Sequence, residues 1–137
     1  PNAKVVCCER NIKDNFLSLY KNYFASIKHM GWSFDPDEII KYCKMYLDLS
    51  KFWKNKYSDF IYQLDYDKLV LNNENEIMKL LKFCDLTWDP NCLSHHKNSK
   101  AAINTVSIYQ ARKPIYSSSL NSSKNYEAYL HDYFKKL

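Results

Sequence analysis

Glycine is almost absent from this sequence of 137 residues, in which Gly31 is the only one. A single glycine cannot build a glycine-rich loop that cradles phosphate groups, so these residues exclude such a loop. No apolar run approaches the ~20 residues that cross a bilayer, and no signal peptide opens the sequence. We therefore expect no interaction with membranes.

A disulfide framework is not indicated either. The five cysteines are odd in number and lack the regular spacing of paired cysteines. Cys43 and Cys84 occupy apolar helical patterns, where a thiol behaves as a small hydrophobic group. This usage is typical of a reducing compartment, and we expect a cytoplasmic protein.

Arginine is scarce although the chain is basic. The net charge is +5, and all of the twenty basic residues except Arg10 and Arg112 are lysine. The basic residues are spread along the chain, which favours an anionic ligand but not the clustered basic face of a nucleic-acid-binding protein. A planar guanidinium suits bidentate binding of phosphate, so the two arginines are candidate ligand residues unless their placement is accidental.

Apolar residues make up 46% of the sequence, enough for the core of one domain. Residues 4–8 lack polar alternation, as expected of a strand buried on both faces. The order of elements favours an α/β fold with a short parallel sheet flanked by helices, in which two strands make an incomplete sheet. The spacing predicts strands at residues 4–8 and 60–64, and helices at residues 12–28, 36–56, 74–84 and 125–136.

Two of these helices begin with recognisable capping residues. Asn11 is expected to cap the helix that starts at residue 12, with Asp14 completing a start that resembles a capping box. Asp35 is expected to cap the next helix, because Pro36 suits the first helical position.

Arg10 is the strongest candidate for a ligand-binding residue. It lies where a predicted strand ends and a helix begins, and ligands of open α/β sheets bind at that edge. The helix N-terminus adds unpaired N–H groups that attract an anion, and Ser18 further along can add a hydroxyl. The alternative is an exposed arginine that forms a salt bridge, beside a serine on the helix surface.

The pattern Arg10-Asn11-x-Lys13-Asp14-x₃-Ser18 is similar to the 3′-phosphate-binding motif of sulfotransferases that use 3′-phosphoadenosine-5′-phosphosulfate (PAPS). Residues 64–70 resemble the family segment Tyr-Glu-Asp-Leu-Val, whose tyrosine lies against the adenine. Residues 86–89 and the helix before them match a third family stretch. Residues 107–116 resemble the region that closes over the nucleotide in the tyrosylprotein and bacterial tetratricopeptide-linked branch.

This resemblance implies an incomplete, P-loop-like sulfotransferase domain formed by residues 1–137. It implies transfer of a sulfonate group from PAPS to a hydroxyl or phenol, with adenosine 3′,5′-bisphosphate as the nucleotide product. The loop for the 5′-phosphosulfate and the catalytic base belong upstream in the family, so we expect no catalytic residue here and no activity from this chain alone. The nucleotide-binding residues it implies are Arg10, Ser18, Tyr66, Ser107 and Lys124. Tyr66 could instead be half-buried filler after a strand.

The sequence departs from the family pattern at two places. Ser122-Ser123 stand where the tetratricopeptide-linked branch has Arg-Trp, which leaves Lys124 as the candidate cation there. Asn22 stands where some relatives carry a second basic residue, and Lys21 is a loose substitute for it.

Two other classes of function stay open. The chain could be a non-catalytic remnant that binds a nucleotide or a protein, or part of a P-loop kinase that requires Mg²⁺. We expect no metal, because His95-His96 and Cys92 lack a fourth ligand and regular zinc spacing. The expected partners are a small-molecule or peptide acceptor and a second copy of the chain. That homodimer would bury an apolar strand edge, and we expect no nucleic acid.

Overall fold

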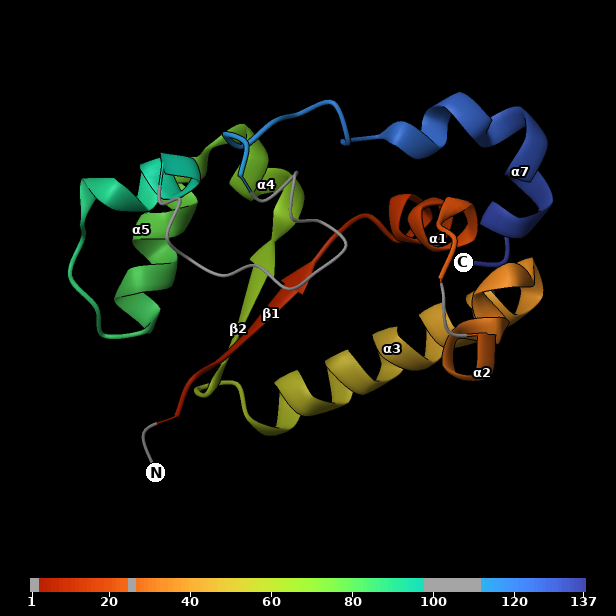
Figure 1. The fold of residues 1–137 in the computed structure, drawn as a ribbon. Helices are drawn as coiled ribbons and strands as arrows, with labels where there is room; N and C mark the ends of the chain where they lie inside the picture. The colour runs from red at the N-terminus through yellow and green to blue at the C-terminus, as the bar shows by residue number, and fades with distance from the viewer. Residues whose placement is uncertain (1–2, 25–26, 98–111) are drawn as a thin grey trace.

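The computed structural model describes residues 3–24, 27–97 and 112–137. Two strands lie in the middle of the molecule, with helices on both sides of them (Figure 1). The predicted α/β class, with a short parallel sheet flanked by helices, is therefore confirmed. The described elements are β1 (Val5–Glu9), α1 (Ile12–Lys21), α2 (Ile27–Met30), η1 (Gly31–Phe34), α3 (Pro36–Lys56), β2 (Ile61–Asp65), α4 (Tyr66–Leu71), α5 (Asn73–Phe83), η2 (Pro90–Lys97), η3 (Ser122–Tyr126) and α7 (Glu127–Phe134).

The two strands pair in parallel, in a register that positions the functional residues. Val5 lies opposite Ile61, and Glu9 lies opposite Asp65. Because the strands are parallel, both carboxyl ends meet at the same edge of the sheet. The residues that follow each strand therefore begin as spatial neighbours.

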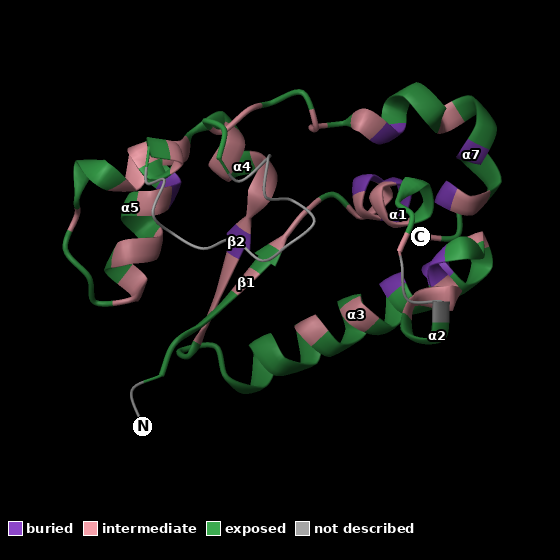
Figure 2. Ribbon diagram, viewed as in Figure 1, coloured by how far each residue is buried: buried purple, intermediate pink, exposed green. Residues whose placement is uncertain are grey.

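The buried core lies beside the sheet, where α1, the first half of α3 and α7 meet (Figure 2). Phe16 of α1 is fully buried and contacts Phe134 of α7 edge to face, at 5.7 Å between ring centroids. Full burial of each such side chain contributes ~1.5–3 kcal/mol to stability. This packing holds α1 firmly, so its N-terminal end has a defined position at the sheet edge. The buried hydrophobic side chains of this core are Phe16, Leu17, Ile39, Ile40, Cys43, Leu130 and Phe134.

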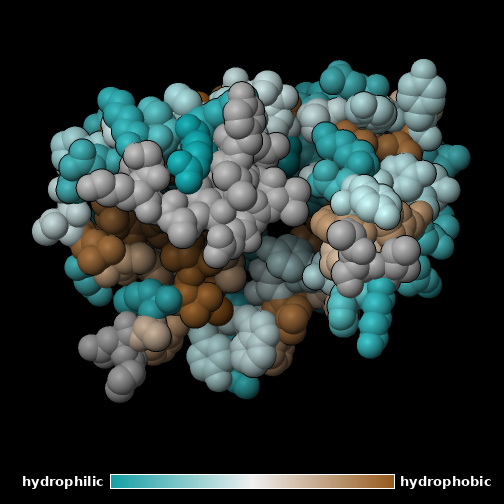
Figure 3. Space-filling model, in the orientation of Figure 1, coloured by the Kyte–Doolittle hydropathy of each residue, from teal (hydrophilic) through white to brown (hydrophobic). Residues whose placement is uncertain are grey.

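The expectation that the first strand is buried on both faces was wrong. Val5 is 48% exposed and Val6 is 43% exposed. Among the described residues β1 has β2 as its one neighbouring strand, and the helical core packs elsewhere. Figure 3 shows hydrophobic surface in this region, near the start of the two strands.

The predicted N-caps are confirmed. The Asn11 side chain accepts hydrogen bonds from the backbone N–H groups of Lys13 and Asp14, at 3.0 and 3.4 Å. Asp35 likewise accepts from two backbone N–H groups in the first turn of α3, whose first residue is Pro36. Asp14 does not complete a capping box, because its carboxylate contacts the C-terminal segment of the chain instead.

The helix expected at residues 12–28 ends early. The last residue of α1 is Lys21, and Asn22 has an extended backbone that starts a new direction. The expected strand at residues 60–64 is shifted by one residue, and α4 directly after it was not predicted. Asp65 explains α4, because its side chain accepts from the Lys68 N–H at 3.1 Å and caps this short helix.

Candidate functional site

Arg10 and Tyr66 meet at the carboxyl edge of the sheet. Arg10 directly follows β1, and Tyr66 is the first residue after β2. The guanidinium carbon Cζ lies 5.4 Å from the centroid of the Tyr66 ring, close enough for an attractive cation–π contact. The edge therefore presents a forked cation and an aromatic ring side by side.

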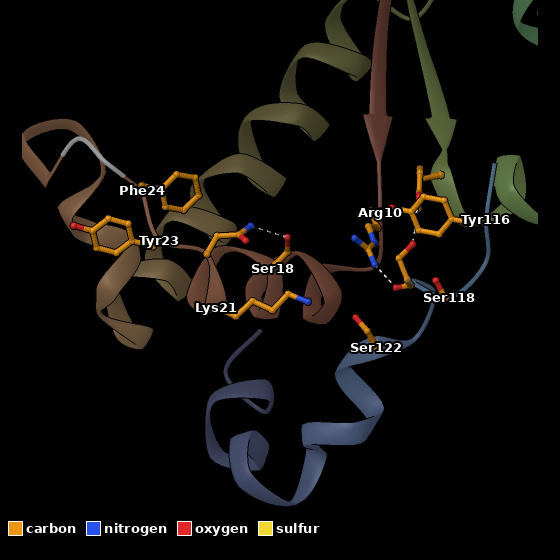
Figure 4. Close-up of a pocket in the computed structure, with 11 residues that line it drawn as sticks. Arg10, Ser18, Lys21, Tyr23, Phe24, Tyr116, Ser118 and Ser122 are labelled. Carbon is orange, nitrogen blue, oxygen red and sulfur yellow. Dashed lines mark hydrogen bonds between the residues drawn. The ribbon is translucent and has the colours of Figure 1, made fainter. Parts of the chain in front are cut away.

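A cavity of about 550 Å³ lies beside this pair (Figure 4). It combines side chains from α1, from the segment after α1 and from the C-terminal segment, so its walls come from distant parts of the sequence. Hydroxyl groups, two cations and several aromatic rings all face the same space. The lining residues are Arg10, Ser18, Lys21, Asn22, Tyr23, Phe24, Tyr66, Tyr116, Ser118, Ser119 and Ser122.

Arg10 is held in place from one side of its guanidinium. Its Nη2 atom lies 3.5 Å from a carboxylate oxygen of Asp14 and also donates to the backbone carbonyl of Ser119. Its Nε atom is buried and has no hydrogen-bond partner among the described residues. A buried donor without a partner costs ~1–3 kcal/mol, and a bound anion would supply the missing acceptor. The residues at this position thus fit a phosphate group.

Asp14 ties Arg10 to the C-terminal segment. Its carboxylate accepts from the Ser123 N–H at 2.7 Å and from the Ser122 hydroxyl at 3.4 Å. Burial acts to raise the pKa of Asp14, but the hydrogen bonds from Ser123 and the charge of Arg10 outweigh it, so the pKa is lowered. Asp14 is therefore a buried carboxylate at neutral pH, and it joins α1 to the segment that closes one side of the cavity.

Three residues predicted from the sequence line this cavity together: Arg10, Ser18 and Tyr66. The Ser18 hydroxyl accepts from the Asn22 side chain at 3.5 Å, and the Tyr66 hydroxyl lies 3.3 Å from that of Ser119. Their proximity supports a shared ligand, although their roles stay predictions.

Of the two other predicted residues, the structure describes Lys124 alone. Lys124 is exposed on η3 and is not among the described residues that line the cavity. Ser107 lies outside the described residues. Lys21, considered a loose substitute from the sequence, is the lysine that lines the cavity. The sequence indicated Lys21 through its position on α1, because it lies about one helical turn beyond Ser18 and therefore on a similar face.

Apart from Tyr66, the aromatic residues of the cavity were not predicted as ligand-binding residues. Tyr23 and Phe24 fall in the stretch that was expected to continue α1, and Tyr116 lies in the C-terminal segment. Tyr116 belongs to residues 107–116, which resemble the region that closes over the nucleotide, so the sequence marked its neighbourhood. Tyr23 and Phe24 line the cavity because α1 ends at Lys21 and the chain turns there.

A second cavity of about 700 Å³ lies on the other side of Arg10 and is richer in acid groups. It includes Glu9, Asp65 and Asp67 together with Lys54 and Lys68. Burial, followed by the charges of Asp65 and Asp14, raises the pKa of Asp67. Because clustered carboxylates repel an anion, the first cavity is the better phosphate site.

We searched the described parts of the chain for groups of metal ligands and for helices that could cross a membrane. Within residues 3–24, 27–97 and 112–137, no group of three or more His, Cys, Asp or Glu side chains is placed to hold a metal ion. In the same ranges, no helix combines the length and apolar character needed to cross a membrane.

The fold and the cavity define an α/β protein with a candidate anion-binding site at the edge of a parallel sheet. A family model described as "Sulfotransferase family" matches residues 1–90, which is most of the chain. The chain therefore belongs to the sulfotransferase family, as the sequence motifs predicted. The more specific tetratricopeptide-linked or tyrosylprotein branch stays a prediction.

An uncharacterized protein of Aquifex aeolicus (strain VF5) is 39% identical to this chain over 132 residues. The match covers 95% of the chain but 17% of the length of that relative. No solved structure matches the chain significantly.

Proposed function

We propose that the whole protein transfers a sulfonate group from PAPS to a hydroxyl or phenol, and that this chain supplies the binding site for the 3′-phosphate and adenine. The products would be a sulfate ester, adenosine 3′,5′-bisphosphate and a proton. The observation that carries the proposal is that Arg10, Ser18 and Tyr66 line one cavity. Family membership supports the sulfonate transfer.

Each of these residues would have a distinct role. Arg10 would bind the 3′-phosphate with its fork, and Ser18 would donate a hydroxyl to the same group. Tyr66 would place its ring against the purine. Lys21 lines the same cavity and would add a positive charge beside the phosphate groups. The resemblance instead assigns the remaining phosphate contacts to Ser107 and Lys124. These groups bind and orient the nucleotide, and such positioning is a major part of group-transfer catalysis.

Isothermal titration calorimetry with adenosine 3′,5′-bisphosphate tests the proposal. A charge-assisted hydrogen bond contributes ~1.5–3 kcal/mol, so Arg10→Ala should weaken binding roughly ten-fold or more. Arg10→Lys should recover only part of the affinity, because the fork is lost. Lys44→Ala is the control, since Lys44 is an exposed cation on α3 and is not among the described residues that line the cavity.

A second ligand makes the test specific for the 3′-phosphate. Adenosine 5′-monophosphate lacks this group, so its weaker binding should be nearly the same in wild type and Arg10→Ala. Binding of both ligands should also be independent of Mg²⁺, which separates this site from that of a kinase. Equal affinity of wild type and Arg10→Ala for the bisphosphate would refute the assignment.

A further inference from the structure

The C-terminal half of α3 extends beyond the core. Cys43 is the last buried residue of this helix, and every residue from 51 to 60 is exposed (Figure 2). Three aromatic side chains lie at this end of the helix, where Phe52 is 52% exposed, Trp53 is 42% exposed and Tyr57 is 43% exposed. Exposed apolar surface that gathers at one point is a candidate binding site.

These three rings, which we call the α3 aromatic cluster, form a corner. Phe52 and Trp53 meet edge to face, with centroids 5.1 Å apart and planes at 75°. Trp53 and Tyr57 are stacked, with centroids 5.7 Å apart and planes at 18°. The Tyr57 N–H donates to the Trp53 carbonyl at 2.9 Å, which fixes the backbone that carries both rings. The cluster therefore presents ring surfaces in two orientations.

A cation already lies on this cluster. The Nζ atom of Lys56 lies 5.6–5.9 Å from the centroids of all three rings. Cation–π attraction extends to about 6 Å, so the rings attract this ammonium group but hold it weakly. No ion pair among the described residues includes Lys56. Aromatic rings, and no carboxylate, thus provide the attraction for positive charge here.

The end of α3 adds to this attraction. The cluster lies at the last turn of a helix of 21 residues, and a helix C-terminus carries a partial negative charge. Lys54 is close in sequence, but its ammonium group donates to the Gln63 side chain. The field at the cluster therefore favours a cation.

The chemistry of the cluster selects the kind of cation. A primary ammonium ion is strongly hydrated and needs acceptors for its three N–H donors, which ring faces replace poorly. A trimethylammonium group has no N–H donor, and its methyl groups pack directly against the rings. Aromatic sites of this kind are suited to quaternary ammonium ligands.

We propose that Phe52, Trp53 and Tyr57 bind the trimethylammonium group of a ligand, and that Lys56 is a tethered occupant that leaves when the ligand binds. Lys56 is exposed, so rotation of its side chain is enough to clear the rings. The proposal does not rest on the proposed function, because the cluster shares no residue with the described lining of the nucleotide cavity.

The test is binding of choline to the full 137-residue chain, measured by NMR titration of the backbone amides. The largest chemical-shift changes should fall on residues 52–57. The uncharged isostere 3,3-dimethyl-1-butanol has the same shape without the charge, so it should bind much more weakly. The absence of saturable choline binding, shifts centred elsewhere, or equal binding of the isostere would overturn the proposal.

Trp53→Ala should weaken choline binding roughly three- to ten-fold, because tryptophan is the ring that attracts cations most strongly. Tyr129→Ala is the control, since Tyr129 is an exposed aromatic residue on α7 outside the cluster. Its replacement should leave choline affinity unchanged. Equal losses in the two variants would contradict the site.

Lys56 gives a change in the opposite direction. Lys56→Met removes the competing ammonium group and its repulsion, so choline should bind several-fold more tightly. Lys44→Met is the matched control, because Lys44 is an exposed lysine of the same helix about 18 Å away along its axis. It should leave the affinity nearly unchanged. Weaker choline binding by Lys56→Met would show that Lys56 is part of the site, not its occupant, and would overturn the proposal.

Vesicles of phosphatidylcholine identify the source of the trimethylammonium group. Sedimentation of the chain with these vesicles, lost in Trp53→Ala, assigns the site to a lipid head group. Choline binding without such sedimentation assigns it to a free compound. Binding of neither choline nor vesicles refutes the site.

Discussion

The guanidinium of Arg10 lies over the ring of Tyr66, with Cζ 5.4 Å from the ring centroid. The parallel register produces this contact, because Glu9 is opposite Asp65 and each of the two residues follows directly on its strand. The same ring lines the candidate nucleotide cavity. Tyr66 therefore contacts the cation that would bind phosphate, and it would also offer an aromatic surface to a purine.

Replacing Tyr66 should separate the contribution of its ring from that of its hydroxyl. Tyr66→Ala removes both the support of Arg10 and the stacking surface, so affinity for adenosine 3′,5′-bisphosphate should fall roughly ten-fold. Tyr66→Phe loses only the contact with the Ser119 hydroxyl and should change affinity much less. Calorimetry at one salt concentration checks both, and equal losses would mean that the hydroxyl, not the ring, is the important group.

Lys21 should matter more for nucleotide binding than Lys124. Lys21 lines the cavity, whereas Lys124 is exposed on η3 and is not among the described lining residues. Lys21→Ala should weaken binding of the bisphosphate several-fold and should reduce its dependence on salt concentration. The matched replacement Lys124→Ala should have little effect. A larger loss from Lys124→Ala would restore the ligand assignment that the resemblance implies.

Asp14 should contribute to stability in a pH-dependent way. It is 1% exposed, and its carboxylate accepts from the Ser123 N–H at 2.7 Å. Asp14→Ala leaves that buried donor without a partner, so the free energy of unfolding should fall by ~1–3 kcal/mol at pH 6. Since the folded-state pKa of Asp14 lies below the ordinary 3.8, its contribution is present above that value and disappears as pH falls through the folded pKa.

Urea unfolding at pH 6 and at pH 3 measures this effect. The stability difference between wild type and Asp14→Ala should be largest at pH 6 and should narrow at pH 3. Asp132→Ala is a suitable control, because Asp132 is exposed on α7. A difference that grows on acidification would contradict the assigned ionisation.

The 137-residue chain should self-associate through β1. Val5 and Val6 are exposed on a strand that pairs with β2 alone among the described strands. Apolar strand edges are templates for pairing with another chain, and a two-fold dimer is the simplest closed assembly. Val6→Lys should shift sedimentation velocity profiles toward monomer. Leu71→Lys places the same charge on an exposed helical residue and should not, and a monomeric wild type at micromolar concentration would contradict the prediction.

Local chemistry was enough to predict several elements of the fold. Asn11 and Asp35 cap the helices that they were expected to cap, because the interaction of a side-chain oxygen with the next backbone N–H groups is local. The burial of β1 could not be predicted from its local sequence. It depends on which elements cover the strand, and the apolar residues of α1, α3 and α7 pack against one another instead.

The sequence by itself determined the sulfotransferase motif, the strand that ends before Arg10, and the helix that carries Ser18. These are contiguous or periodic features, and a short stretch of chain specifies each one. Only the tertiary structure decided which side chains share the cavity. Lys21, Tyr23 and Tyr116 meet there, and Ser122 and Ser123 turn to Asp14, because folding brings the C-terminal segment against α1. Contacts between segments this far apart depend on the packing of the whole core, and no local pattern encodes them.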